Sequence, residues 1–102
     1  MQEIEIFGIK ARVARTFPER ARGLIGTRSL PDSEGLLIER CNAIHTFFMS
    51  FKIDALFLDR DNRIVKAVRG IRPWRFFVWG GWRAVKVLEI KSKEEKDDSH
   101  SC

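Results

Sequence analysis

The sequence predicts a single small α+β domain that is mainly β, a compact antiparallel sheet or partly open barrel with one helix near the N-terminus. Three observations predict it. First, 102 residues leave room for one modest core. Second, short apolar stretches alternate with polar residues along much of the chain, which is typical of half-buried strands. Third, one segment in the first third carries the start signals of a helix.

The first strands are expected on either side of Gly8. Apolar residues alternate with polar ones before and after this glycine, at Ile4, Ile6, Ile9, Ala11 and Val13. This period of two predicts two strands or one bent strand. A bulge or tight turn is expected at Gly8, because glycine adopts unusual backbone angles at little cost.

A helix start follows at Thr16. The Thr16 hydroxyl can cap the helix, and Glu19 lies three residues later, as in a capping box. Pro18 is tolerated in the first turn. We expect a helix over residues 17–25 that ends at Gly26. Its apolar face would consist of Phe17, Ala21, Leu24 and Ile25.

Four residues of this segment are expected to be structural: Thr16, Glu19, Arg20 and Gly23. Glu19 would complete the capping box. Arg20 would pair with a buried carboxylate such as Asp54 or Asp59. Gly23 inside a helix suggests close approach by another backbone, because glycine otherwise weakens a helix.

The second half of the chain is expected to form more strands. Residues 53–59 and 63–68 form the clearest hairpin, because Asp61 and Asn62 tolerate the backbone angles that a tight turn demands. Two further strands are expected at residues 36–38 and 84–90.

Three motifs follow one another along the chain. They are Thr16-x-x-Glu19-Arg20-x-x-Gly23-Leu24-Ile25, Ile44-His45-Thr46-x-Phe48-Met49 and Val87-Leu88-Glu89-Ile90. In order and spacing they resemble the DUF192 family, also called UPF0127, a group of small bacterial and archaeal proteins. The resemblance covers about residues 11–90 and implies a compact, mostly antiparallel β fold with one helix. It implies little about activity, because the family is named for having no established function.

The chain departs from the family pattern after the last strand. Relatives usually continue with a glycine-containing turn and another short element, where this chain has charged residues. The folded domain is expected to cover residues 1–90, with residues 91–102 as a disordered tail. An open sheet edge would favour pairing with a second chain, so a monomer or an edge-paired dimer is expected.

The net charge of +5 is concentrated in one stretch. Between positions 60 and 86 a single acid, Asp61, stands among basic residues, namely Arg60, Arg63, Lys66, Arg69, Arg72, Arg75, Arg83 and Lys86. Such a stretch attracts polyanions, although a solvated face of a small protein has the same composition. No apolar run approaches the ~20 residues of a membrane span. No signal peptide is visible, so a cytoplasmic location is expected.

One apolar run, residues 41–51, contains polar side chains that need partners. Cys41, His45 and Met49 are soft ligands that together suit copper. Residues 46–51 are rich in aromatic side chains and look like a strand, however. On a strand His45 and Met49 would lie about 13 Å apart, too far for one ion unless the chain bends. Alternatively, Cys41 and Met49 simply fill the core. The sequence therefore predicts no metal and no other cofactor.

His45 and Thr46 form a polar pair in the same run. Either His45 bonds to a backbone carbonyl or a carboxylate, or its imidazole faces a ligand and exchanges protons. Asp54 is the carboxylate expected to meet His45 or a guanidinium, since it lies between two apolar residues. A further hypothesis makes Cys41 a nucleophile with His45 as its base, but the sequence offers no orienting group or oxyanion site.

Residues 72–83 interleave cations with aromatic rings and include all three tryptophans. Such a stretch can stack bases and bind phosphates, or anchor a protein partner. Alternatively, the tryptophans close the core and the arginines lie at its rim. Trp74 is a candidate ligand contact. The candidate contacts to an anion or nucleic acid are Arg69, Arg72, Arg75 and Arg83.

Three functional hypotheses follow. The first is a non-enzymatic module that binds an anionic small ligand or a protein segment. Its pocket would be framed by the 72–83 loop together with His45, Thr46, Met49 and Asp54. The second is nucleic-acid binding through residues 60–86, which predicts a steep loss of affinity with salt. The third is a small enzyme that uses His45 with Asp54 or Cys41.

Overall fold

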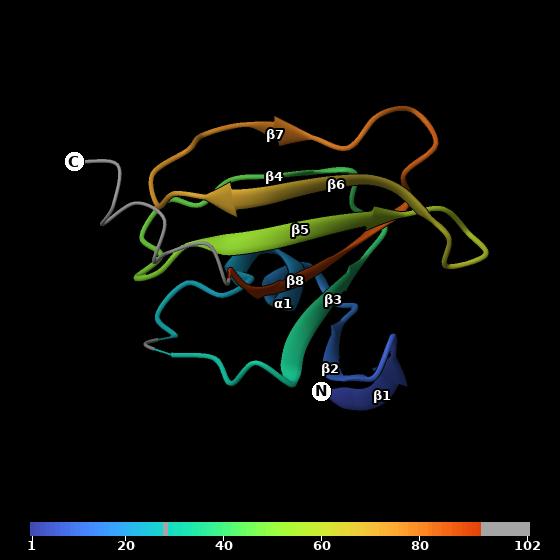
Figure 1. The fold of residues 1–102 in the computed structure, drawn as a ribbon, viewed down its shortest axis with the longest axis horizontal. Helices are drawn as coiled ribbons and strands as arrows, with labels where there is room; N and C mark the ends of the chain where they lie inside the picture. Colours follow the sequence, from blue (N-terminus) through green and yellow to red (C-terminus); the bar gives the residue numbers. More distant parts are fainter. Residues whose placement is uncertain (28, 93–102) are drawn as a thin grey trace.

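The computed structural model describes residues 1–27 and 29–92 of the chain. These residues form one helix, α1 (Phe17–Arg22), and eight strands (Figure 1). The strands are β1 (Gln2–Ile6), β2 (Ile9–Ala14), β3 (Glu34–Glu39), β4 (Ala43–Ile44), β5 (Ile53–Leu58), β6 (Ile64–Ile71), β7 (Val78–Trp79) and β8 (Lys86–Lys91). The mainly β fold with one helix near the N-terminus is thereby confirmed.

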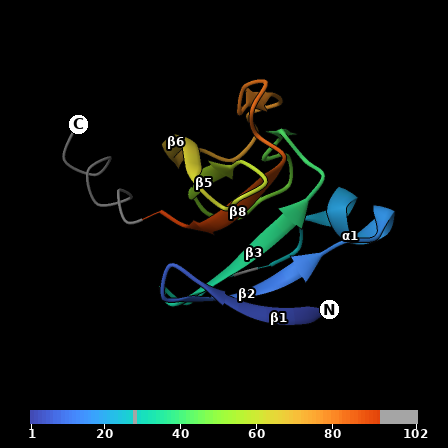
Figure 2. The ribbon, with the colours of Figure 1, turned by 90° about the vertical axis from the view of Figure 1, so that its right-hand side faces the viewer.

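Six strands form one sheet in the order β1-β2-β3-β8-β5-β6. Neighbouring strands are antiparallel except β2 and β3, which are parallel because α1 lies in the connection between them. The sheet is therefore mixed and differs at this pair from the antiparallel sheet expected. It is strongly twisted, so that β3 runs steeply across the direction of β5 (Figures 1 and 2). Among the described residues it does not close into a barrel, and β1 and β6 are its edges.

A small second layer covers one face of the sheet. Strands β4 and β7 pair antiparallel, with Ile44 opposite Val78. Both side chains are buried in the larger of two hydrophobic clusters, together with residues of β3, β5 and β8. The smaller cluster lies on the other face and contains Leu37 and Leu88. Core residues therefore occupy both faces of the central strands.

The turn between β1 and β2 contains two residues, Phe7 and Gly8. Both have positive φ, 54° and 75° respectively. A two-residue turn with positive φ at both positions matches the right-handed twist of its strands. The expectation of a tight turn at Gly8 is confirmed, with two strands rather than one bent strand.

Helix α1 is shorter than predicted. Its capping box is present, but Gly23 adopts φ 53° and ends the helix at Arg22. The predicted apolar helical face was wrong, because α1 buries none of its residues and Phe17 is exposed. Leu24 is buried but lies beyond the helix. Gly23 is thus a helix terminator rather than an interior residue.

The β5–β6 hairpin is confirmed, and its turn is held by Asp59. One carboxylate oxygen of Asp59 accepts hydrogen bonds from the amides of Asp61 (2.9 Å) and Arg63 (3.0 Å). Asn62 adopts φ 64°, as the turn requires. The hydrogen bond from the Arg63 amide stabilises the Asp59 carboxylate and is the main cause that lowers the pKa of Asp59.

Residues 46–51 do not form the strand that their aromatic composition suggested. The chain turns here, with Phe48 at φ 63° and the amide of Met49 donating to the carbonyl of Thr46 at 3.3 Å. An extended strand would have separated His45 from Met49. The turn instead brings both side chains to the lining of one cavity.

The end of the described chain is part of the fold. Lys91 belongs to β8, and the amide of the buried Ser92 donates to the carbonyl of Lys52 at 3.0 Å. The remainder of the expected tail, residues 93–102, lies outside the described residues. Among residues 1–27 and 29–92 no helix is both long enough and apolar enough to cross a membrane.

Candidate functional site

A cavity of about 130 Å³ lies between α1, the segment after β3 and strand β8. We call it the α1–β8 cavity. It is lined by Arg20, Ala21, Arg22, Gly23, Ile25, Ile38, Cys41, Ala43, Ile44, His45, Met49 and Glu89. The lining thus combines guanidinium groups with a carboxyl, an imidazole and a thiol.

Glu89 reaches the cavity from the middle of the sheet. Strand β8 pairs with β3 on one side and β5 on the other, so that Glu89 lies opposite Leu36 and Ala55. Side chains alternate along a strand, and Val87 belongs to the larger core cluster. Glu89 therefore points to the same face as Val87, and only 1% of its surface is exposed.

Burial determines the protonation of Glu89. Desolvation raises its pKa from 4.5 to about 8. Its Oε1 atom has no hydrogen-bond partner among the described residues. At neutral pH the side chain is consequently a mostly neutral carboxylic acid, which can both donate and accept a hydrogen bond.

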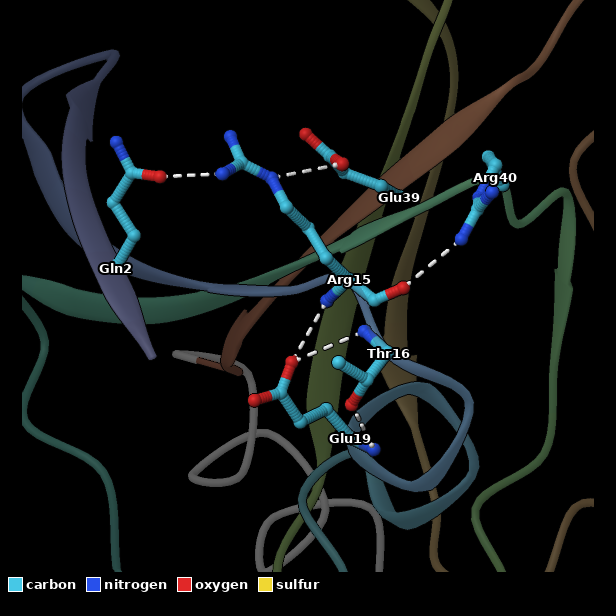
Figure 3. Close-up of polar contacts among 6 residues, drawn as sticks. All are labelled: Gln2, Arg15, Thr16, Glu19, Glu39 and Arg40. Atoms are coloured by element: carbon cyan, nitrogen blue, oxygen red, sulfur yellow. Dashed lines mark hydrogen bonds and ion pairs between the residues drawn. The ribbon is translucent and has the colours of Figure 1, made fainter.

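Arg20 is presented to the cavity by α1, whose first turn is firmly held. The carboxylate of Glu19 accepts hydrogen bonds from the amides of Arg15 (3.0 Å) and Thr16 (3.1 Å), and the Thr16 hydroxyl accepts one from the amide of Glu19 at 3.3 Å (Figure 3). These amides lower the pKa of Glu19. The capping box predicted from Thr16 and Glu19 thus fixes the turn that carries Arg20.

Arg15 ties the same turn to the sheet. Its guanidinium donates to Gln2 of β1 and, at 3.1 Å, to Glu39 of β3, while Arg40 donates to the Arg15 carbonyl at 3.1 Å (Figure 3). The helix start is therefore anchored to two strands. This anchoring gives the cavity wall formed by α1 a defined position relative to β8.

The Nε atom of Arg20 is buried and has no hydrogen-bond partner among the described residues. The prediction that Arg20 pairs with Asp54 or Asp59 was wrong. Asp59 is bound to Arg63, and Asp54 accepts from the amide of Gly70 at 2.8 Å. Both carboxylates belong to the β5–β6 hairpin, where they hold the chain locally and leave Arg20 to the cavity.

Cys41, His45 and Met49, the weak candidate metal ligands, all line the α1–β8 cavity. No group of three or more His, Cys, Asp or Glu side chains in the described part of the chain is arranged to hold a metal ion. The Cys41 thiol donates to the carbonyl of Ala43 at 3.1 Å. Burial is the main cause that raises its pKa above the usual 9.0, so the thiol stays protonated at neutral pH. A nucleophilic cysteine needs the opposite shift.

The ring of His45 is oriented by the backbone. Its Nδ1 accepts a hydrogen bond from the amide of Phe47 at 3.2 Å. In the neutral imidazole the proton therefore sits on Nε2, which is a donor. His45 has a backbone partner, as one of the two interpretations expected, although the partner is an amide rather than a carbonyl. Its position on the cavity wall leaves the ligand-facing interpretation open as a prediction.

Thr46 is fully buried and holds the following loop. Its hydroxyl donates to the carbonyl of Arg72 at 2.6 Å and accepts from the amide of Arg75 at 2.8 Å. The Thr46 carbonyl accepts from the amide of Trp74 at 2.8 Å. These contacts place Thr46 between the segment after β4 and the 72–83 loop, away from the cavity lining.

The 72–83 loop lies outside the cavity. Its residues Trp74, Phe76, Phe77 and Trp82 are exposed, as are Arg72, Arg75 and Arg83. The interpretation in which the tryptophans fill the core was wrong for Trp74 and Trp82. Asp54 and Arg69 lie on the neighbouring hairpin, 3.9 Å apart. The structure therefore separates the pocket expected from the sequence into a cavity with His45 and Met49 and a surface with Trp74.

Sequence reasoning missed Glu89 as a site residue. A signal was present, because Glu89 shares the strand face of Val85 and Val87 and is followed by the apolar Ile90. An acid inside a run of core residues either finds a partner or becomes neutral. That β8 is a central strand, with core residues packed on both of its faces, could not be read from the local pattern.

Comparison with known proteins places the chain in a family. The sequence pattern of the DUF192 family, described as "Uncharacterized ACR", matches residues 2–97. The chain belongs to this family. A UPF0127 protein from Thermococcus sibiricus is 40% identical over 73 residues, which cover 68% of this chain and 47% of that protein. The chain thus spans about half the length of this relative.

Two solved structures share the fold. A protein of unknown function from Novosphingobium aromaticivorans has a TM-score of 0.76 at 20% identity. The match covers 93% of this chain and 74% of the Novosphingobium chain. A Sinorhizobium meliloti protein, described as a proposed transcription regulator, has a TM-score of 0.78 at 19% identity. The match covers 89% of this chain and 74% of the Sinorhizobium chain. At such low identities the likeness establishes the fold alone.

Proposed function

We propose that this protein is a binding module that holds a small anion in the α1–β8 cavity, between Arg20 and Glu89. One observation carries the proposal. Two buried polar atoms of residues that line this cavity, Arg20 Nε and Glu89 Oε1, have no hydrogen-bond partner among the described residues. An unpartnered buried polar atom costs about 1–3 kcal/mol. A ligand that bonds to both relieves both costs at once.

The chemistry of these groups favours an anion. The Arg20 guanidinium is always a charged donor. Glu89, with its pKa near 8, offers a hydroxyl donor at neutral pH. The Nε2 proton of His45 is a third donor on the same wall. Carboxylate and phosphate oxygens accept from all three, whereas a cation would be repelled by Arg20.

The volume of the cavity limits the size of the ligand. About 130 Å³ is slightly less than the roughly 150 Å³ cavity that holds benzene in another protein. The ligand therefore has up to about six non-hydrogen atoms. Acetate and inorganic phosphate are suitable probes of this size, and acetamide is the neutral isostere of acetate.

The test measures urea unfolding at pH 6.5 with and without each probe. If an anion binds only the folded state, a concentration 100 times its dissociation constant raises the free energy of unfolding by about 2.7 kcal/mol. We expect acetate or phosphate to stabilise the protein and acetamide to leave it unchanged. Arg20→Met should abolish the effect, whereas Arg12→Met, at an exposed position on β2, should retain it.

Glu89→Gln separates the role of the neutral acid from that of a charge. Above pH 8 the wild-type carboxyl ionises and should repel the anion, so the stabilisation by acetate should decline. The glutamine amide remains a donor at every pH, so the variant should keep the stabilisation. Equal stabilisation by acetamide, or a full effect in Arg20→Met, would contradict the proposal. So would the absence of any effect at molar acetate, which would leave ordered water as the partner of both atoms.

A further inference from the structure

A second surface of the molecule, independent of the cavity, combines exposed rings with cations. Phe47 contacts Trp74 with 5.9 Å between ring centroids and Phe76 with 6.5 Å, and Phe48 contacts Trp74 at 4.7 Å. We call these four rings, with the neighbouring Arg72 and Arg75, the aromatic–arginine surface. It joins two chain segments that Thr46 holds together.

The rings of this surface are open to solvent. Phe48, Trp74 and Phe76 are 63%, 59% and 76% exposed. Isolated exposed apolar residues are ordinary, but rings in mutual contact form a contiguous apolar patch, which marks an interaction site. The turn that holds them is defined by the two bonds of the buried Thr46 hydroxyl, so the rings stand on an anchored loop.

The charge next to the rings has one sign. Arg72 and Arg75 are exposed, and neither side chain forms an ion pair within the described residues. From residue 62 to residue 88 the sequence contains no acid. A surface of rings and unopposed guanidiniums is complementary to a partner that carries both negative charge and flat apolar groups.

From this we infer that the aromatic–arginine surface binds single-stranded nucleic acid, with bases stacked on the rings and phosphates at Arg72 and Arg75. In a duplex the base faces are already stacked on one another, so they are not available to the rings. Exposed rings beside guanidiniums are the combination on which proteins stack the bases and neutralise the phosphates of a single strand.

The test is fluorescence anisotropy with a labelled oligothymidylate of about 15 nucleotides. Two arginine–phosphate contacts predict a slope of about −1.4 in log K against log salt, which is about a sevenfold loss of affinity from 50 to 200 mM salt. Phe76→Ala should weaken binding about 5- to 150-fold, as for the loss of one stacked base. Arg75→Gln should reduce the slope by about 0.7.

Matched controls lie elsewhere on the chain. Phe17, 74% exposed at the start of α1, is as open as Phe76, so Phe17→Ala should bind like the wild type. Arg12→Gln should leave the salt slope unchanged. Phe48→Ala removes a second ring of the surface and should also weaken binding, so the test holds even if Phe76→Ala fails to fold.

Four results would overturn the inference: no binding at 50 mM salt, binding insensitive to salt, equal losses in Phe17→Ala and Phe76→Ala, or equal affinity for a duplex of the same length. Vesicles of phosphatidylglycerol provide a fifth. If vesicle binding is lost in Phe76→Ala while oligothymidylate binding is not, the surface faces a membrane instead.

Discussion

Glu89→Gln should change the pH dependence of stability in a way that follows directly from burial of the carboxyl. Glu89 has its pKa raised from 4.5 to about 8 by desolvation. An acid with a raised folded-state pKa binds its proton more tightly in the folded state than in the unfolded state. The contribution of Glu89 to stability is therefore largest below pH 4.5, and it falls as the pH rises toward 8.

The magnitude follows from the two pKa values. Each unit of difference is worth about 1.4 kcal/mol. Between pH 5 and pH 7 the unfolded state ionises almost fully while the folded state stays mostly neutral, so this group alone lowers the free energy of unfolding by about 2–3 kcal/mol. The lowered pKa values of Glu19 and Asp59 affect stability at more acidic pH and do not contribute in this window.

The assay is urea unfolding from pH 5 to pH 8 in a buffer without small carboxylates or phosphate. The wild type should lose stability across this range, and Glu89→Gln should be nearly flat. Glu3→Gln, at an exposed position on β1, is the matched control and should keep the wild-type slope. An unchanged slope in Glu89→Gln would refute the assignment of a neutral, buried acid.

Three further substitutions test other parts of the fold. Thr46→Val removes a buried hydroxyl that bonds twice to residues 72–75 and should cost about 2–3 kcal/mol in urea unfolding, whereas an effect below 0.5 kcal/mol would argue against that anchor. Gly80→Ala places a Cβ 2.1 Å from Cδ1 of the fully buried Phe57 and should lower stability by about 3 kcal/mol or more; an unaltered melting temperature would contradict this packing. Thr16→Ala breaks the capping box and should cost about 1 kcal/mol, with faster amide exchange at the helix start as the expected sign.

Features specified by short stretches of sequence were predictable. The capping box depends on Thr16 and Glu19, and the β5–β6 turn was expected from Asp61 and Asn62, of which Asn62 adopts the positive φ. The hydrogen bonds of Asp59 that hold this turn were not predicted. The helix length was not predicted, because a glycine in an otherwise helical stretch can lie inside the helix or end it. Gly23 ends it with a positive φ.

The cavity depended on contacts between distant segments. The parallel pairing of β2 with β3 and the position of β8 between β3 and β5 join residues far apart in sequence. These pairings turn Glu89 from one residue of a strand into a buried acid. The aromatic composition of residues 46–51 suggested a strand, but the turn at Phe48 brings Met49 back to the cavity.

The site residues also divide into those that the local sequence indicated and those whose role depended on the tertiary structure. His45 was recognised from its polar character in an apolar run, and it lines the cavity. Arg20 was assigned a structural pairing, because the sequence could not show that Asp54 and Asp59 are bound within their own hairpin. The residue types were therefore recognisable, whereas the partner of each required the tertiary structure.

The central claim is that Arg20 and Glu89 hold a small anion between them. The most direct measurement is an NMR titration of the arginine Nε–H resonances with acetate at pH 6.5, with Arg20→Lys used to assign the Arg20 signal. We expect the Arg20 signal to shift saturably with acetate and not to respond to acetamide, while the Arg12 signal stays fixed. An Arg20 signal that does not move, or that moves only in parallel with the exposed arginines, would contradict it.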